Sequence, residues 1–418
     1  MRDNSRAFDT DIDSYAPESM PEREEELSDL KKKLRPAVLG GTPSHGIIFG
    51  SSGQGKTLSI RLMTELTKDA CEEEQIDFTT IWVDCEGAGS SHAAIGRLIN
   101  SSREKQGKVG NEDPIGHHQV TLFNRASREL REIGGTIVVV LDGVEDFEGY
   151  DYILYALSEF GGGGVRVGVL VTSTDFGYRG KISAGTKSRI GPFNIHFDRY
   201  RARDIENIIK RRCVAGLQKT GFEQPETYDG FHSEYITDDA INLCATHASS
   251  EKGDARRAIM ILKRAVAHVD NHFKRDTIRR EDIDRAIEQI EKEITIKNII
   301  QKPTPVQFTL LCLVKNSLDG CEWVRTAHIK SQWDSDVTLW REGVVHRTIH
   351  SYLKRLEASQ LVDKEYRSSG SDSSSDYWKL TEPVELVLES IKTTNDPASK
   401  YASKIIDSYE ISIENERL

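Results

Sequence analysis

Short apolar segments alternate with stretches of helical periodicity through the first half of the chain. Five of these segments are short apolar runs, which predicts strands at Gly46 to Phe49, Phe78 to Val83, Ile137 to Leu141, Val165 to Thr172 and Asn194 to Phe197. The glycine run at 161–164 is predicted to be a turn or loop before the fourth strand. Because regular alternation of strand and helix is typical of a parallel sheet with helices on its faces, we expect an α/β domain here.

Two further regions carry helical signals. Leu30 and Leu34 recur at helical spacing in a charged segment, which predicts an amphipathic helix from Glu22 to Leu34. From Arg201 to about Lys292 the strand pattern vanishes, and Thr237 is a candidate helix N-cap there. This second region is predicted to be a small helical domain.

The last part of the chain has a different order of elements. Pro303 and Pro305 mark a boundary, after which three short helices precede a hairpin with its turn at Ser368 to Ser375. Helices followed by a hairpin are typical of a winged-helix domain. We therefore expect a flexible tail at 1–14, an α/β core at 15–198, a helical domain at 199–295, a winged helix at 296–393 and a C-terminal tail at 394–418.

One helix of the predicted winged-helix domain is strongly amphipathic. It runs from Val344 to Leu356, with an apolar face formed by Val345, Ile349, Tyr352, Leu353 and Leu356. A second face carries side chains suited to phosphates and to base edges in a major groove: His346, Arg347, His350, Ser351 and Lys354. This pattern predicts DNA binding, and the alternative is a winged helix that docks protein.

Composition narrows the class of protein. The chain has 418 residues and a net charge of -11, so any affinity for a polyanion must come from a local basic surface. It has no apolar stretch of the roughly 20 residues that span a bilayer, and its polar N-terminus is unlike a secretory signal, so we expect a cytoplasmic protein. Six scattered cysteines without a CxxC pair predict reduced, mostly buried thiols.

A complete phosphate-binding motif follows the first predicted strand and precedes a helix. It matches G-x-x-x-x-G-K-[ST] at Gly50, Ser51, Ser52, Gly53, Gln54, Gly55, Lys56 and Thr57. Glycines let the backbone N–H groups face phosphates, and the helix N-terminus adds partial positive charge. Lys56 is therefore expected to reach the β- and γ-phosphates of ATP or ADP, and the Thr57 hydroxyl to bind Mg²⁺.

An acidic residue ends the third predicted strand. Asp142 follows five apolar residues, where a Mg²⁺-binding aspartate is expected in such nucleotide sites. Many ATPases place a glutamate directly after this aspartate, but this chain has Gly143. Glu145 and Asp146 come next, on the following turn, and Glu145 is a candidate to act on water.

With these motifs the chain resembles the archaeal origin-recognition and cell-division-control initiators, which are AAA+ ATPases. The resemblance covers roughly residues 15–391 and includes the segments Tyr15 to Glu18 and Pro21 to Glu26 before the core. It implies an AAA+ P-loop parallel-sheet core with a helical lid, followed by a C-terminal winged-helix domain. It also implies that Arg23, in a segment that helps to enclose the adenine, belongs to the nucleotide site.

The resemblance assigns further roles. Arg256, in the segment Gly253 to Ala258, stands where the family has the sensor 2 arginine that contacts the γ-phosphate. Thr174 stands where sensor 1 usually has asparagine, and Arg189 is the candidate arginine finger that reaches a neighbouring subunit's ATP. Gly143, Thr174 and Gly185 depart from the family pattern, so we expect firm ATP binding with slow hydrolysis.

In the family the recognition helix reads DNA, the wing reaches toward the minor groove, and an insertion helix after the second strand also touches DNA. The wing here has Arg367 at its base but also carries Asp372 and Asp376, and the insertion region at 92–100 lacks a strong basic signal.

Three functions stay open. The first is an initiator that binds duplex origin DNA, self-associates on it and recruits the replicative MCM helicase. The second is an ATP-switched transcription or partition regulator. The third is an NTPase whose winged helix contacts protein.

Overall fold

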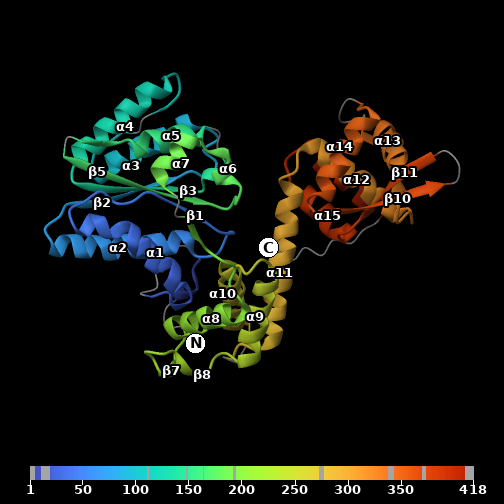
Figure 1. Ribbon diagram of the computed structural model, residues 1–418. Helices are drawn as coiled ribbons and strands as arrows, with labels where there is room; N and C mark the ends of the chain where they lie inside the picture. The colour runs from blue at the N-terminus through green and yellow to red at the C-terminus, as the bar shows by residue number, and fades with distance from the viewer. Residues whose placement is uncertain are drawn as a thin grey trace. The chain divides into compact units, whose positions relative to one another are not determined.

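The computed structural model describes residues 5–10, 19–110, 113–146, 149–162, 164–191, 194–272, 277–337, 343–369 and 373–409. The chain divides into two compact units, Met1–Ala286 and Ile287–Leu418 (Figure 1). The predicted adenine-side segment at 15–18 and Asp372 lie outside the described residues.

The first unit is built on a mostly parallel sheet with the strand order β2-β3-β5-β1-β6. The five predicted strands are confirmed as β1 (Gly46–Phe49), β2 (Phe78–Asp84), β3 (Thr136–Asp142), β5 (Val165–Ser173) and β6 (Asn194–His196). The glycine run is partly a strand, because β4 (Gly161–Gly162) pairs antiparallel with β5. Glycines pair through the backbone alone, so the side-chain pattern gave no sign of this short strand.

Strand β3 explains why helices cover both faces of this sheet. Successive side chains of a strand point to opposite faces. Val138 and Val140 pack with α1 and α2, whereas Val139 and Leu141 pack with α3 to α5 (Figure 1). The helices of this part are α1 (Glu24–Val38), α2 (Lys56–Glu73), α3 (Ser91–Lys105), α4 (Gln119–Ile133), α5 (Tyr150–Ser158), α6 (Tyr178–Lys181) and α7 (Ala184–Ile190).

The predicted core boundary at residue 198 falls between β6 and a mainly helical lid. The lid contains α8 (Ala202–Gly216), α9 (Asp238–Ser250), α10 (Ala255–His272) and the first part of α11 (Arg280–Ile300), whose later residues belong to the second unit. The Thr237 hydroxyl accepts a hydrogen bond from the Ala240 N–H at 3.3 Å, which confirms the predicted N-cap of α9.

The prediction that the lid lacks strands is wrong. Strands β7 (Thr220–Gln224) and β8 (Asp229–Ser233) form an antiparallel hairpin between α8 and α9. Both strands are largely solvent-exposed and rich in polar residues, so they show no apolar alternation. Apolar alternation in a sequence reveals a strand only where one face of the strand is buried, and this hairpin has no substantial buried face.

The predicted N-terminal tail is also partly ordered. A 3₁₀ turn, Ser5–Phe8, packs on α8, where the Ala7 and Phe8 side chains are 0% and 1% exposed. Arg212 donates a hydrogen bond to the Ala7 carbonyl at 3.0 Å. Two apolar residues are too few to produce a periodic signal, which is why residues 5–10 resembled a free tail.

The second unit has the helix and strand order of a winged helix. After α12 (Thr304–Leu318) come β9 (Val324–Arg325), α13 (Thr326–Gln332), α14 (His346–Glu357), β10 (Val362–Ser369) and β11 (Ser373–Leu380). The three strands form one antiparallel sheet in the order β10-β11-β9. Its core contains the fully buried Trp333 and Trp378, and the Trp378 indole donates to the Thr326 hydroxyl at 2.8 Å.

Two helices follow the wing, α15 (Val384–Lys392) and α16 (Pro397–Ser408). The expectation of a C-terminal tail from residue 394 is therefore wrong for α16. Asp396 caps this helix, and Tyr401 and Ile405 are buried in the core of the second unit. Small alanines and serines between these apolar positions weakened the periodic pattern in the sequence.

Candidate nucleotide site and nucleic-acid surface

The phosphate loop lies between β1 and α2, as predicted, and its glycines are sterically required. Gly53 and Gly55 have φ of +74° and +84°, a region that disfavours other residues. A Cβ atom on Gly53 would lie 1.7 Å from the Asp254 Oδ1 atom of the lid. The loop can therefore approach Asp254 of the lid this closely only because Gly53 has no side chain.

Lys56 is held at the start of α2 with only 9% of its surface exposed. Its Nζ donates to the carbonyls of Gly50 at 2.7 Å and Ser51 at 2.8 Å. Burial lowers the pKa of the Lys56 ammonium, while Glu145 and Asp142 oppose this shift. A buried cation on the phosphate loop is suited to bind an anionic phosphate group.

Asp142 ends β3 and faces the first turn of α2. The Thr57 hydroxyl donates to Asp142 Oδ2 at 2.9 Å, and the Thr172 hydroxyl bonds to Oδ1. Thr172 also accepts a hydrogen bond from the Gly143 N–H at 2.9 Å, so it fixes both the carboxylate and the turn after it. A hydroxyl and a carboxylate side by side are hard oxygen ligands of the kind Mg²⁺ prefers.

Glu145 enters the same site from the short turn after β3. Its Oε1 accepts hydrogen bonds from Thr174, at 2.7 Å from the hydroxyl and 3.2 Å from the N–H. Its Oε2 is buried without a hydrogen-bond partner among the described residues. Gly143 has φ of +75°, so a glutamate at that position would be strained. The geometry thus offers Glu145 as the carboxylate near the phosphate loop.

These groups line one cavity of about 930 Å³ within the first unit. Arg256, in the first turn of α10, also lines it, as does Thr174. The sequence reasoning missed Asp84, the last residue of β2, and Glu86, two residues later, which add two carboxylates to the wall. The sequence did contain a sign of Asp84, because this residue ends a strand. That strand pairs with β3, so Asp84 lies at the same edge of the sheet as Asp142.

Gln54 has a structural part that the motif did not reveal. Its side chain is fully buried, and its amide donates to the carbonyls of Gly253 at 2.9 Å and Lys252 at 3.2 Å. Its Oε1 accepts from the Tyr200 N–H at 3.1 Å. One side chain therefore ties the phosphate loop to the turn before α10, which carries Arg256.

Arg23 does not line the cavity, in contrast to its expected place in the nucleotide site. It is 4% exposed, with its guanidinium 3.8 Å from the centre of the Tyr200 ring. It donates to Gln54 Oε1 at 3.2 Å and to the Asp198 carbonyl at 2.7 Å. Arg23 thus holds the Gln54 side chain in place by a hydrogen bond and does not itself line the nucleotide cavity.

Arg189 lies on α7, outside the cavity. It forms an ion pair with Glu159, and its guanidinium lies 4.9 Å from the centre of the Tyr155 ring. The predicted contact of Arg189 with a neighbouring subunit stays a prediction.

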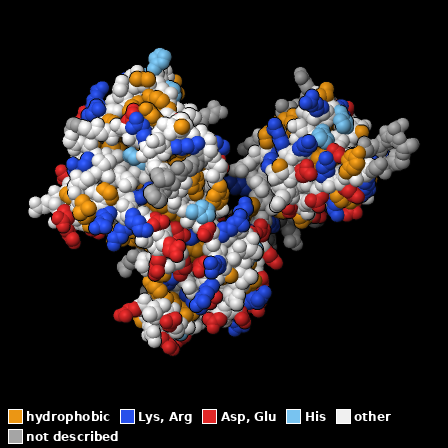
Figure 2. Space-filling view, in the orientation of Figure 1, with side chains coloured by type: hydrophobic (Ala, Val, Ile, Leu, Met, Phe, Trp, Pro, Cys, Tyr) orange, Lys and Arg blue, Asp and Glu red, His pale blue; other side chains and the backbone are white. Residues whose placement is uncertain are grey.

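Helix α14 of the second unit presents a polar outer face. His346, Arg347, Ser351 and Lys354 are exposed, while Ile349 and Leu353 are fully buried. Val345, predicted to be buried, is 67% exposed because it precedes the helix as its N-cap. Figure 2 shows cationic and acidic side chains interspersed over the visible surface of this unit, without one continuous basic area.

His350 differs from its neighbours on α14, because it contacts the wing. Its Nε2 lies 2.8 Å from Asp376 Oδ2 on β11, and Lys364 reaches the same oxygen at 3.0 Å. Burial alone would raise the pKa of the Asp376 carboxyl, but the hydrogen bonds from His350 and Lys364 outweigh it and lower that pKa. Asp376 is therefore kept as a carboxylate, and its contacts with His350 and Lys364 join α14 to the wing.

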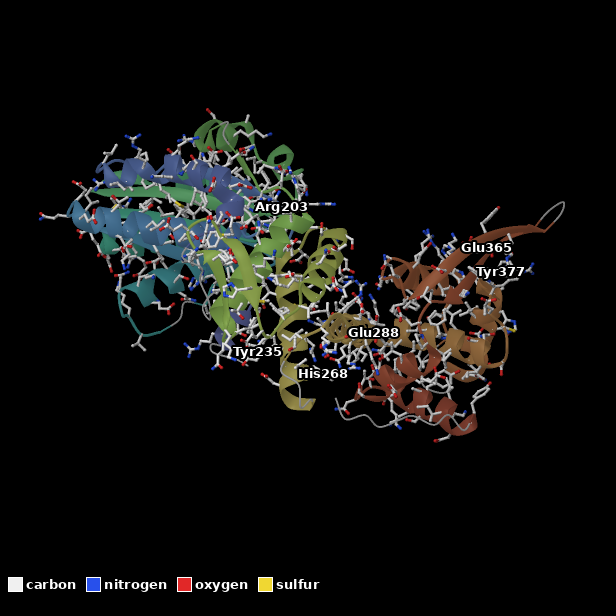
Figure 3. The ribbon with its side chains drawn as sticks, turned by 90° about the horizontal axis from the view of Figure 1, so that it is seen from below. Arg203, Tyr235, His268, Glu288, Glu365 and Tyr377 are labelled. Carbon is white, nitrogen blue, oxygen red and sulfur yellow. The ribbon has the colours of Figure 1, made fainter. Side chains whose placement is uncertain are left out.

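The positive charge of Arg367 is also partly balanced by an acidic partner. It donates to Glu365 Oε2 at 2.6 Å and lies over the rings of Tyr377 and Trp323, at 4.8 and 5.4 Å from their centres. Glu365 and Tyr377 are cross-strand partners on β10 and β11, and both are labelled at the wing in Figure 3. The wing base thus carries an arginine among aromatic rings.

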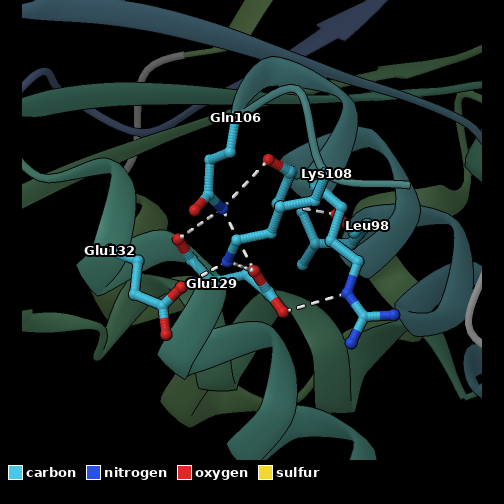
Figure 4. A network of polar contacts seen from close by, with 7 residues as sticks. Leu98, Gln106, Lys108, Glu129 and Glu132 are labelled. Atoms are coloured by element: carbon cyan, nitrogen blue, oxygen red, sulfur yellow. Dashed lines mark hydrogen bonds and ion pairs between the residues drawn. The ribbon is translucent and has the colours of Figure 1, made fainter. Parts of the chain in front are cut away.

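The region after β2 holds together through a buried acid. Glu129 of α4 accepts from Arg103 at 3.0 Å, Lys108 at 2.6 Å and Gln106 at 3.1 Å, which joins α3 to α4 (Figure 4). The predicted apolar residues of α3, such as Ile95 and Leu98, are fully buried.

The fold and the site together define a P-loop nucleotide-binding protein of the AAA+ class. A family model described as an AAA domain matches residues 39–172. A second model, the Cdc6 AAA+ ATPase-type lid domain, matches residues 227–288.

Similarity to known proteins extends over most of the chain. It is 26% identical over 388 residues to ORC1-type DNA replication protein 15 of Haloarcula marismortui, covering 91% of this chain and 90% of that protein. It is 26% identical over 294 residues to ORC1-type DNA replication protein 1 of Archaeoglobus fulgidus, covering 69% and 66%. The Aeropyrum pernix ORC1 protein, solved in complex with DNA, matches with a TM-score of 0.78 and 21% identity over 96% of this chain and 98% of that one.

These comparisons confirm the resemblance to archaeal AAA+ proteins of the ORC1/Cdc6 type that the motifs indicated. In the described parts of the chain, no helix has the length and apolar character needed to cross a membrane.

Proposed function

We propose that this protein is a DNA replication initiator in which ATP binding is the switch. It binds duplex origin DNA through α14, self-associates there and recruits the replicative MCM helicase, acting in the cytoplasm on the nucleoid. The names of its relatives, ORC1-type DNA replication proteins, support the replication role.

The observation that carries this proposal is that one chain combines a preformed phosphate site with an exposed polar helix face. Lys56, Thr57 and Arg256 line the cavity and would hold the phosphates, and Asp142 and Thr57 would hold Mg²⁺. The metal ion would neutralise phosphate charge. On the second unit, Arg347 and Lys354 are exposed on α14, where cations suit the DNA backbone and base edges.

Hydrolysis is expected to be slow. Glu145 is held by Thr174 on a turn two residues beyond the usual position, and Gly143 leaves that position without a carboxylate. We expect steady-state turnover on the order of 10⁻² s⁻¹ or slower, in the range of switch NTPases. Phosphate release by the purified protein measures this, and turnover of about 10 s⁻¹ that disappears in Glu145→Gln would contradict it.

The direct test is selective recovery of genomic DNA. Purified protein with Mg-ATP is incubated with fragments of its own genome at two salt concentrations, and the bound fragments are sequenced. Recovery of one or a few intergenic sites that coincide with replication starts supports the initiator. Sites away from replication starts favour the transcription or partition regulator, and uniform recovery favours a winged helix that docks protein.

Arg347→Ala tests the role of α14. We expect it to weaken binding to a recovered site by about 1–3 kcal/mol if Arg347 reads a base, and much less on random DNA. Fluorescence anisotropy with both DNAs measures the difference. Lys404→Ala, which removes an exposed cation from α16 of the same unit, is the matched control. Wild-type affinity of Arg347→Ala for the site would remove this residue from the interface.

A further inference from the structure

The cavity of the first unit extends well beyond the phosphate loop. Its far side is lined by Phe222, Pro225 and Tyr228 of the β7–β8 hairpin and by Ile208 and Ala215 of α8. This end combines aromatic and apolar side chains with the paired Arg211 and Glu22, whereas charged groups line the end at Lys56. A nucleotide whose phosphates lie on the loop would therefore place its base and ribose toward the hairpin, because bases favour aromatic and apolar surroundings.

The hairpin rings form a packed group at this end. Phe222 and Tyr228 meet edge to face, with 5.5 Å between ring centres, and Arg211 lies 5.1 Å from the centre of the Tyr228 ring. Arg211 also donates to Glu22 Oε1 at 2.7 Å. Glu22 precedes α1, so the aromatic group of the lid is connected to the segment that leads into the core.

A second contact joins the hairpin to that same segment. The Tyr228 hydroxyl lies 2.8 Å from the Ser19 hydroxyl, across 209 positions of sequence. Ser19 and its neighbour Met20 both line the cavity. The tip of the hairpin and the start of the core thus meet on the cavity wall, and the contact is solvent-exposed, so that it can open.

Tyr228 is held for this contact by an unusual backbone. Its φ is +59°, in the left-handed region that large side chains rarely adopt. Gly230, two residues on, also has a positive φ of +69°. This turn conformation directs the ring against Phe222, where it lines the cavity.

We propose that the β7–β8 hairpin is a clasp over the base and ribose of the bound nucleotide, with Phe222 and Tyr228 in contact with them. The hydrogen bond between Tyr228 and Ser19 holds the clasp shut and sets how fast nucleotide leaves. This inference rests on the proposed ATP site, and it assigns control of nucleotide exchange to a part of the lid remote from the phosphates.

The test is the rate at which excess ATP displaces a fluorescent N-methylanthraniloyl-ATP from the full-length protein. Loss of the hydroxyl in Tyr228→Phe is expected to speed release about threefold to tenfold, the effect of one hydrogen bond. Phe222→Ala is expected to speed it about tenfold or more, the effect of one stacking ring. Tyr235→Ala is the matched control, because it removes a ring of the lid just after β8 that does not line the cavity.

Ser19→Ala gives an independent reading, since it removes the same hydrogen bond from the other side and should match Tyr228→Phe. Unchanged release in Tyr228→Phe and Ser19→Ala, or equal acceleration in Tyr235→Ala and Phe222→Ala, overturns the clasp. If the wild-type protein shows no saturable binding of the analogue, the ATP site itself is wrong. Release that is measurable but equal in all variants removes the clasp alone.

Discussion

Replacing Gln54 by leucine is expected to lower the free energy of unfolding of the first unit by about 2–5 kcal/mol. The substitution keeps the volume but leaves the carbonyls of Lys252 and Gly253 and the Tyr200 N–H without their buried partner. A buried polar group that loses its partner costs about 1–3 kcal/mol, and these three share one side chain. Chemical unfolding of the full-length protein measures the loss.

A second variant separates the two sides of this contact. Gln54→Glu can still accept from Arg23 and Tyr200 but cannot donate to the two carbonyls of the lid turn. We therefore expect faster amide hydrogen exchange around Gly253 in Gln54→Glu, and around both Gly253 and Tyr200 in Gln54→Leu. Gln218→Leu, an exposed glutamine of the same unit, is the control. Wild-type unfolding and exchange in Gln54→Leu would show that this link between loop and lid is dispensable.

This buried glutamine shows where the sequence was informative and where it was not. The phosphate loop follows a rule of local spacing, since glycines, lysine and threonine must occur in order between a strand and a helix. Its position could therefore be predicted, as could β3 with Asp142 at its end. The partners of Gln54 lie nearly 200 positions away, and the motif allows any residue there, so nothing local indicated a buried network.

The same reasoning explains Arg23 and the hairpin. Arg23 lies in a charged segment, and only the position of Tyr200 in space turns it into a buried side chain. The β7–β8 hairpin has weak apolar alternation because it covers a cavity and not a core. His350 looked like its neighbours on α14 until β11 brought Asp376 against it. Long-range contacts decided each of these cases, and no local pattern contains them.

Lys56→Ala is expected to raise the dissociation constant for Mg-ATP by about a hundredfold, the upper range for a charge-assisted hydrogen bond. The Lys56 ammonium is a buried cation that interacts electrostatically with Asp142 and Glu145, so its loss leaves these two carboxylates less compensated beside the phosphate loop. Those carboxylates would then repel the phosphates. Isothermal titration calorimetry measures the change, with Lys68→Ala on the exposed face of α2 as the control.

The same variant tests whether ATP is a switch. If nucleotide binding controls DNA binding, Lys56→Ala should recover genomic sites equally with and without ATP, while the wild-type protein should depend on it. Unchanged ATP affinity in Lys56→Ala would place the nucleotide elsewhere than on this loop. A third outcome is that Lys56→Ala loses ATP affinity but the wild-type protein recovers DNA equally with and without ATP. This result would support the ATP site but exclude the switch, because a ligand shifts an equilibrium only by its differential affinity for the two states.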